Sequence, residues 1–183
     1  MQLRINGNEL KQVLTAVSKD KYRDPLHCLH IERVGNRVEF ATTDGSALVV
    51  MSRPLATYDD DLPEDFRLTV DLTPYKISDK NIYHLIEENG QMFLLGPDIK
   101  IAIMPYTEVD FPNYHSILQG FEDLPLAEKF ALFSEANIKK LFKIFDWSDG
   151  LTPKAKSNNT PHYWSKKRGD SVWVVVLMPI RTK

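Results

Sequence analysis

Residues that could carry out catalysis are sparse in this sequence. The chain of 183 residues has no GxSxG, GxxxxGK[ST], HExxH or CxxC motif, so the common nucleophile, phosphate-loop and zinc patterns are missing. The run from His27 to His30 contains metal-ligating types, but successive side chains of a strand point to opposite faces, so at most two of them converge. We interpret this run as a strand with polar edges, and we predict no catalytic residue, no metal site and no cofactor.

Two acidic features allow a chemical and a structural interpretation. The run Asp59-Asp60-Asp61, followed by Glu64 and Asp65, has the oxygen ligands that a hard cation prefers, but it is more typical of a solvated loop. Asp44 lies in Thr43-Asp44-Gly45 between two alternating runs, which is the usual sequence of a hairpin turn. We favour the structural interpretation for both.

Positive charge is segregated along the chain. Between residues 138 and 168 there are eight basic residues and only two acidic ones. Lysines without neighbouring Asn or Gln side chains that could read bases would contact phosphates irrespective of sequence, and salt would weaken that contact. The alternative is that a charged outer face only keeps each helix soluble. The candidate phosphate-contacting residues are Lys11, Lys19, Lys21, Arg23, Lys139, Lys140 and Lys143.

Two amphipathic helices would present these lysines. Apolar residues recur at helical spacing in residues 8–19, with Asn8 as the expected N-cap, and again in residues 135–146, with Ser134 as the expected N-cap. Each helix follows a short alternating run, at residues 3–5 and 129–133. The apolar positions that would face the core are Leu10, Val13, Leu14, Val17, Ile138, Leu141, Phe142 and Phe145.

Strand-like hairpins follow each helix, and a third stretch repeats the pattern more weakly. Three times a glycine-containing turn leads into an apolar run that ends near Met and Pro. In the middle copy, residues 74–81 have room for only a turn or two of helix. A supersecondary repeat of this length indicates units that stack to share a core, although an ordinary α+β domain with similar hairpins would also fit. The expected strands are 28–34, 37–43, 46–52, 67–73, 82–89, 91–96, 99–105, 161–167 and 171–178.

Two segments interrupt the units. Residues 58–66 are acidic, and residues 119–128 combine turn and acidic residues without periodicity, so the second segment is the best candidate for a linker. We therefore predict a domain of two units at residues 1–118, a linker at 119–128, and a single further unit at 129–183.

Composition indicates a soluble protein in a reducing compartment. Apolar residues make up 43% of the chain, the formal net charge is −2, and Cys28 is the single cysteine, so no disulfide framework is possible. No signal peptide is recognisable at the start, and no apolar run reaches the roughly 20 residues that cross a bilayer. We expect a cytoplasmic protein with no membrane contact.

Three stretches carry a resemblance to a known family. These are Thr43-Asp44-Gly45-Ser46-Ala47-Leu48, Phe111-Pro112-Asn113-Tyr114, and the near-terminal Leu177-Met178-Pro179-Ile180-Arg181. In order and type they are similar to the T-D-G-H-R-L, F-P-D-Y and V-M-P-M-R stretches of the bacterial sliding clamp, the β subunit of DNA polymerase III. Residues 1–118 resemble one complete clamp domain and residues 129–183 half of another, as in a shortened or phage-type relative.

The resemblance implies a fold, partners and a second site. The implied class is an α+β DNA-clamp fold of repeated β-α-β-β units, with antiparallel sheets outside and helices on one face. The implied partners are double-stranded DNA and peptides of a DNA polymerase or clamp loader. Ser46-Ala47 replaces the family's His-Arg, which puts peptide specificity in doubt. The groove residues carried over are Leu48, Pro112, Ile117, Met178, Pro179 and Ile180.

Two functional hypotheses follow from the resemblance. The first is a non-enzymatic processivity factor that tethers DNA without sequence preference, with the ring closed by a homo-oligomer in which four chains supply about a dozen units. The alternative is a monomeric or dimeric clamp-like module that binds a replication protein without encircling DNA.

Overall fold

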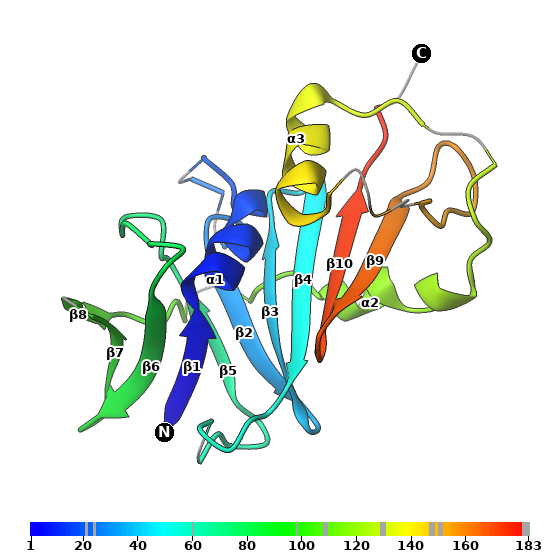
Figure 1. Cartoon of the computed structure of the whole chain (residues 1–183). Helices are drawn as coiled ribbons and strands as arrows, with labels where there is room; N and C mark the ends of the chain where they lie inside the picture. The colour runs from blue at the N-terminus through cyan, green and yellow to red at the C-terminus, as the bar shows by residue number, and fades with distance from the viewer. Residues whose placement is uncertain are drawn as a thin grey trace.

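The computed structural model describes residues 1–20, 22–23, 25–59, 61–97, 99–107, 110–128, 131–146, 149 and 152–180. Their strands form two antiparallel sheets, with helices laid across them (Figure 1). The four-stranded sheet has the order β1 (Gln2–Asn6), β6 (Ile82–Glu88), β7 (Gln91–Gly96), β8 (Ile99–Ile103). The six-stranded sheet has the order β5 (Arg67–Val70), β2 (Leu29–Val34), β3 (Arg37–Thr43), β4 (Ala47–Pro54), β10 (Ser171–Leu177), β9 (His162–Arg168).

The first two units exchange strands. β1 opens the first unit yet pairs with β6 of the second, and β5 opens the second unit yet pairs with β2 of the first. Each of these two sheets therefore contains strands from both units. The exchange covers one edge of each meander, that of β6 by β1 and that of β2 by β5.

The third unit extends the sheet of the first. β10 pairs antiparallel with β4, with Val175 opposite Val49 and Leu177 opposite Ala47, and β9 closes the hairpin at the outer edge. Alternation along both strands sends Trp173 and Val175 to the same face as Val49 and Met51. Segments more than a hundred residues apart in sequence thus share one continuous sheet.

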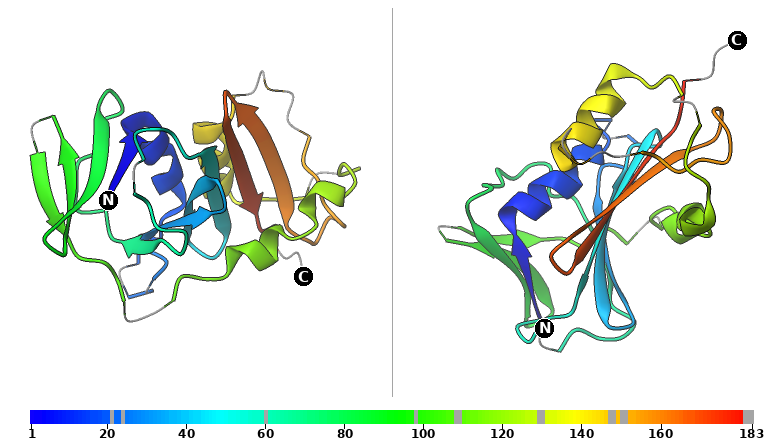
Figure 2. Two further views of the ribbon diagram at one scale, coloured as in Figure 1. Left: turned by 90° about the horizontal axis from the view of Figure 1, so that it is seen from below. Right: turned by 45° about the vertical axis from the view of Figure 1, so that its right-hand side comes forward.

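Two longer helical segments lie side by side on one face of this sheet (Figures 1 and 2). Helix α1 (Gly7–Val13) continues into a 3₁₀ turn, η1 (Leu14–Ala16), and α3 (Glu135–Ile144) follows the cap at Ser134. The prediction of Ser134 is confirmed, because its hydroxyl accepts from Asn137 N. The first helix differs from prediction: Asn6, not Asn8, is the N-cap, and the helix does not continue to residue 19.

One core joins both sheets and these helices. It contains Leu10 and Val13 of α1 and Leu141 and Ile144 of α3, packed with inward residues of every layer such as Trp173. Burying one Val, Leu or Ile side chain contributes about 1.5–3 kcal/mol to folding, so tertiary packing stabilises these short helices. The apolar stripes of both helices were correctly predicted to face inward, although Phe142 is only half-buried and Ile144 is buried in its place.

A second apolar cluster covers the opposite, outer face of the six-stranded sheet. Leu48, Val50, Val174 and Val176 point outward there and pack under the segment that holds α2 (Tyr114–Leu118) and a 3₁₀ turn, η2 (Phe121–Asp123). The sheet is therefore covered on both faces, by helices α1 and α3 on one side and by residues 111–121 on the other (Figure 2).

Two predicted elements do not form. Residues 71–81, all of which the structure describes, contain turns and no helix. The strand expected at 129–133 is also missing at residues 131–133, while Lys129 and Phe130 lie outside the described residues. A single backbone bond from Ile180 N to Leu132 O, 2.8 Å long, replaces a ladder there. No helix in the described part of the chain is long and apolar enough to span a membrane.

Candidate functional site

The first candidate site is the solvent side of helices α1 and α3. Because the apolar stripes of both helices enter the same core, their polar sides emerge on the same side of the molecule (Figure 2). Lys11 projects from α1 and lies 3.8 Å from Asp79, with both side chains more than half exposed. Lys139 and Lys143 project from α3 and are exposed. We call Lys11, Lys139 and Lys143 the helix-face lysines.

The helix-face lysines are held only weakly. Lys139 pairs with Glu135 at 2.5 Å, but this i,i+4 pair is exposed and contributes a few tenths of a kcal/mol. Lys143 makes no ion pair or hydrogen bond with any residue that the structure describes. Their ammonium groups therefore remain accessible to an anionic partner.

Lys140 has a different place. Its side chain is only 15% exposed and forms an ion pair with Asp44 in the turn between β3 and β4, and it also reaches Asn137. Burial opposes ionisation of Asp44, but the hydrogen bonds from Lys140 and from the amides of Ser46 and Ala47 outweigh it and lower the pKa of Asp44. Lys140 thus fastens α3 to a turn of the first unit.

Among the remaining predicted cations, Arg23 contacts that same turn. Lys19 is exposed after the 3₁₀ turn η1, and Arg23 donates to the carbonyl oxygen of Asp44 at 3.3 Å. Lys21 lies outside the described residues. The Asp44-Gly45 turn itself forms as expected, with Gly45 at a φ of +87°.

The six predicted groove residues are divided between core and surface. Leu48 is 4% exposed and packs beneath α2, whereas Ile117, Met178 and Ile180 are 41%, 43% and 48% exposed. Pro112 borders a cavity of about 700 Å³ whose described lining contains none of the other five. Met178 donates its amide to Ser46 O at 2.9 Å, which places the end of β10 beside the start of β4.

The small residues Ser46 and Ala47 have a structural role. Ala47 is 2% exposed in the main core, and the Ser46 hydroxyl lies 3.2 Å from Asn137 Oδ1 on α3. A larger side chain at Ser46 would crowd Asn137 of α3, and one at Ala47 would crowd the core. The departure from the family's His-Arg therefore accompanies close packing of the third unit on the first.

Comparison with known proteins gives the fold. No protein-family model matches the chain, and no curated protein matches its sequence. Among solved structures, the putative DNA polymerase III β subunit of Eubacterium rectale superposes with a TM-score of 0.70 at 8% identity, and that of Borrelia burgdorferi with 0.70 at 11%. The sliding clamp of Pseudomonas aeruginosa gives 0.66 at 13%.

This chain has the sliding-clamp fold. Each superposition covers 100% of the chain but only 66%, 63% and 67% of those bacterial clamps, so the chain spans about two thirds of their length. A. fulgidus PCNA, solved with the C-terminal region of FEN-1, matches over 99% of its chain with a TM-score of 0.58 at 15% identity. The predicted fold class, an α+β clamp fold with antiparallel sheets and helices on one face, is confirmed.

This structure also contains a cluster of polar side chains that the sequence analysis did not predict. Glu32 on β2 and Glu39 on β3 lie under α2, where Tyr114 and His115 contact them. The turn at Gly35-Asn36 already places Glu32 opposite Glu39, so half of the cluster was implied by the hairpin. The approach of α2 to this hairpin had no sequence signal.

Proposed function

We propose that the chain is a sliding-clamp-like processivity factor that tethers double-stranded DNA without catalysing a reaction. The observation that carries the proposal is the placement of α1 and α3, from different units, on one face of the sheet (Figure 2). Their solvent-exposed residues include Lys11, Lys139 and Lys143. Contacts from such lysines go to phosphates and carry no sequence information, so the protein would slide along the duplex.

Encirclement of DNA requires more than one chain. In the described residues, the outer strands are β1 and β8 of one sheet and β5 and β9 of the other. β8 and β9 each have one side without a strand partner, although Tyr163 of β9 bonds the backbone of Lys154 on that side. Head-to-tail pairing of β8 with β9 of another copy would continue the sheets, and it gives a ring when the rotation closes. Light scattering with and without a circular duplex tests this: a strict monomer in both conditions excludes a ring.

Topology separates sliding from simple adhesion. A ring is expected to stay on a nicked circular duplex through gel filtration and to be lost when the same DNA is cut once. Equal retention on the circle and the linear form would contradict encirclement, because electrostatic adhesion alone does not depend on DNA ends.

Charge reversal of two helix-face lysines tests the DNA-facing side. The variant K139E/K143E is expected to weaken binding to duplex DNA at least tenfold at low salt, because each lost phosphate contact removes roughly 0.9 from the slope of log affinity against log salt. Lys140 is left unchanged because it fastens α3 to the Asp44 turn. Fluorescence anisotropy with a labelled duplex measures the effect.

A single charge reversal on the other face controls for net charge when it is compared with K139E alone. Lys167 lies on β9, four residues from Tyr163 of the outer cluster and therefore on the same side, so K167E changes the charge on the face opposite the helices. K167E is expected to bind DNA as the parent does. Equal affinities of K139E/K143E and the parent would exclude the helix face as the contact surface.

One observation favours the second candidate, a clamp-like interaction module that binds a replication protein without encircling DNA. The turns at residues 71–81 stand where the middle unit would have a third lysine-bearing helix, so fewer helices are available to face DNA. Peptides of a polymerase or clamp loader are the partners that we propose for the surface around Pro112, Ile117 and Met178. Peptide binding without retention on circular DNA would select this candidate.

A further inference from the structure

The outer face of the clamp fold contains an unusual pair of carboxylates. Glu32 and Glu39 are directly opposite each other in the β2–β3 ladder, and Glu32 is 5% exposed. Like charges at opposed ladder positions destabilise a sheet unless a cation or a proton compensates for them. Compensation must come from groups that reach this face.

Tyr114 and His115 of α2 reach the pair. His115 Nε2 lies 2.7 Å from Glu32 Oε1, and the Tyr114 hydroxyl lies 2.6 Å from Glu32 Oε1 and 2.8 Å from Glu39 Oε2. A phenol has a single hydrogen, so it donates to one carboxylate only. The Tyr114 oxygen and the oxygen of the second carboxylate then approach each other with no hydrogen between them. This indicates that a further cation or proton belongs at this point.

A second histidine lies beside Glu32. His30 Nδ1 bonds Thr69 Oγ1 at 2.8 Å, and its Nε2 lies 3.7 Å from Glu32 Oε1. Glu32 Oε1 therefore faces His30 as well as Tyr114 and His115.

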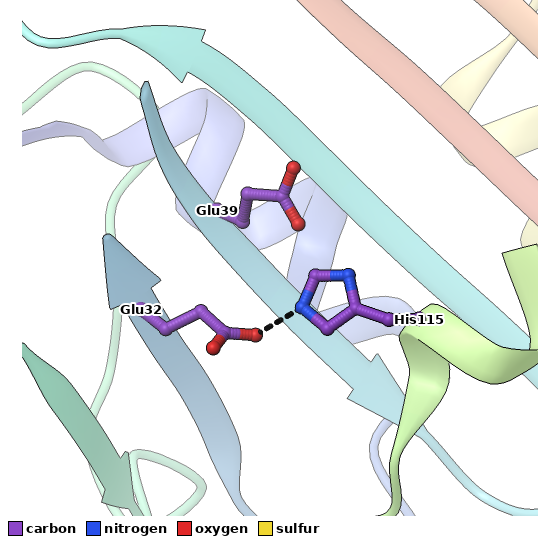
Figure 3. Close-up of side chains that lie close together, drawn as sticks. All are labelled: Glu32, Glu39 and His115. Carbon is purple, nitrogen blue, oxygen red and sulfur yellow. Dashed lines mark hydrogen bonds and ion pairs between the residues drawn. The ribbon is translucent and has the colours of Figure 1, made fainter. Parts of the chain in front are cut away.

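We propose that Glu32, Glu39 and His115 form a binding site for a divalent transition metal of the zinc type. One ligand atom from each residue lies within 4.8 Å of the others, and in Figure 3 the three side chains point toward one another. Bonds of about 2.0–2.2 Å in tetrahedral geometry separate ligand atoms by roughly 3.3 Å, so small side-chain rotations suffice. The mixed imidazole and carboxylate set favours zinc over magnesium or calcium.

The site has an entrance and room for a fourth ligand. The cavity of about 700 Å³ beside α2 is bordered by Glu32, Tyr114 and His115 as well as by Arg67. Arg67 Nε is 3.5 Å from Glu32 Oε2, and its side chain is 76% exposed, so it approaches the carboxylate from the rim and leaves Oε1 to the site. A water molecule would complete the coordination.

Metal binding would tie the covering segment to the sheet. Glu32 and Glu39 belong to the β2–β3 hairpin of the first unit, whereas His115 belongs to α2, more than seventy residues later. Pro112 and Ile117 flank His115 in the chain. A bound ion would therefore fix the position of the residues proposed to meet partner peptides, although the site itself does not depend on that proposal.

Calorimetric titration of the chelator-treated full chain with zinc chloride tests the site. The expected result is one saturable equivalent per chain, with affinity lowered at least tenfold in H115A and in E39Q, because each removes one ligand. H84A is the matched control. His84 on β6 bonds Gln2 on β1, and both lie in the four-stranded sheet, which does not contain the site, so H84A should bind zinc as the parent does. Absence of a saturable equivalent, or unchanged affinity in H115A, would overturn the proposal.

Spectroscopy on the unaltered chain keeps the test independent of variant folding. Zinc-edge X-ray absorption is expected to show oxygen and nitrogen ligands with the scattering of at least one imidazole, and cobalt substitution should give the visible bands of a four-coordinate ion. Zinc bound without any imidazole would place the metal elsewhere and refute the assignment.

Discussion

Replacing Asp59 by alanine is expected to lower the free energy of unfolding by about 3–5 kcal/mol, because it leaves a buried guanidinium without its counter-charge. Asp59 accepts two hydrogen bonds from Arg53, at 2.6 and 3.0 Å, and the two side chains are 0% and 10% exposed. Arg53 also donates to Arg4 O at 2.7 Å, and Asp59 accepts from Arg4 N at 3.2 Å. The pair therefore joins β4 of one sheet to β1 of the other.

The effect of D59A should depend on pH. Burial opposes ionisation of Asp59, but the hydrogen bonds and charge of Arg53 and the amide of Ala56 outweigh it and hold the pKa of Asp59 below its usual value. A carboxyl whose pKa is lowered by folding stabilises the folded state fully at pH values above its pKa in the unfolded chain. This stabilisation is lost as the pH falls through its pKa in the folded protein. The difference between parent and variant is thus full at neutral pH and shrinks below about pH 4.

Urea unfolding followed by circular dichroism measures both effects. D79A is the matched control, because Asp79 pairs with Lys11 across 3.8 Å with both side chains more than half exposed, and its loss should change stability by less than about 0.5 kcal/mol. A loss below about 1 kcal/mol in D59A would contradict a role for the pair in holding the two sheets together.

Sequence patterns predicted local elements well because hairpins set their own register. Alternation bounded by Gly35-Asn36 and Asp44-Gly45 predicted β2, β3 and β4 to within about two residues, and the ladders follow from the turns. Ser134 began α3 as expected because its cap is local. The pairing of β1 with β6 and of β5 with β2 could not be predicted, since each joins segments tens of residues apart and either unit alone offers an equally plausible partner.

The predicted elements that are shorter than expected or missing are prevented from forming by tertiary contacts. The first helix ends early because Ser18 N bonds Leu26 O at 2.8 Å, which turns the chain away after η1. The alternating run before α3 cannot add to β10, because β10 already pairs with β4 and β9. Residues 71–81 form turns instead of the helix expected in the middle unit. Gly7 N bonds Asn81 O at 2.8 Å there, and α1 occupies the adjoining space.

The two sites differ in how many of their residues could be predicted from the sequence. The helix-face lysines were predicted because a helix of known phase fixes which residues face solvent. Lys140 has the same residue type and helix, yet its ion pair with Asp44 depends on a turn about a hundred residues earlier. Likewise, Glu32 and Glu39 follow from one hairpin, but Tyr114 and His115 meet them only through the fold of the chain. Assignment of Leu48 to a groove or to the core required the position of α2. The domain limits 1–118 and 129–183 stay a prediction.

Replacing Gly7 by alanine is expected to destabilise the protein by about 3 kcal/mol, although alanine normally stabilises a helix by about 1 kcal/mol relative to glycine. A Cβ at this first residue of α1 would lie 2.1 Å from Ser78 O and 2.7 Å from Asn81 O. Both contacts are backbone atoms and cannot rotate away. The Tyr83 hydroxyl accepts from Ser78 N at 2.8 Å, and Tyr83 is 1% exposed, so the loop cannot retreat without disturbing the core.

A second glycine separates this packing effect from the general cost of the substitution. Gly35 has a φ of +60°, and a Cβ there would meet nothing within 4 Å, so G35A should cost only the roughly 1–2 kcal/mol of a left-handed residue. Thermal and urea unfolding of the two variants give the comparison. G7A should show the larger loss and, if α1 shifts, weaker DNA binding as well, because the shift would move Lys11. A neutral or stabilising G7A would mean that α1 does not pack on residues 78–81 in solution.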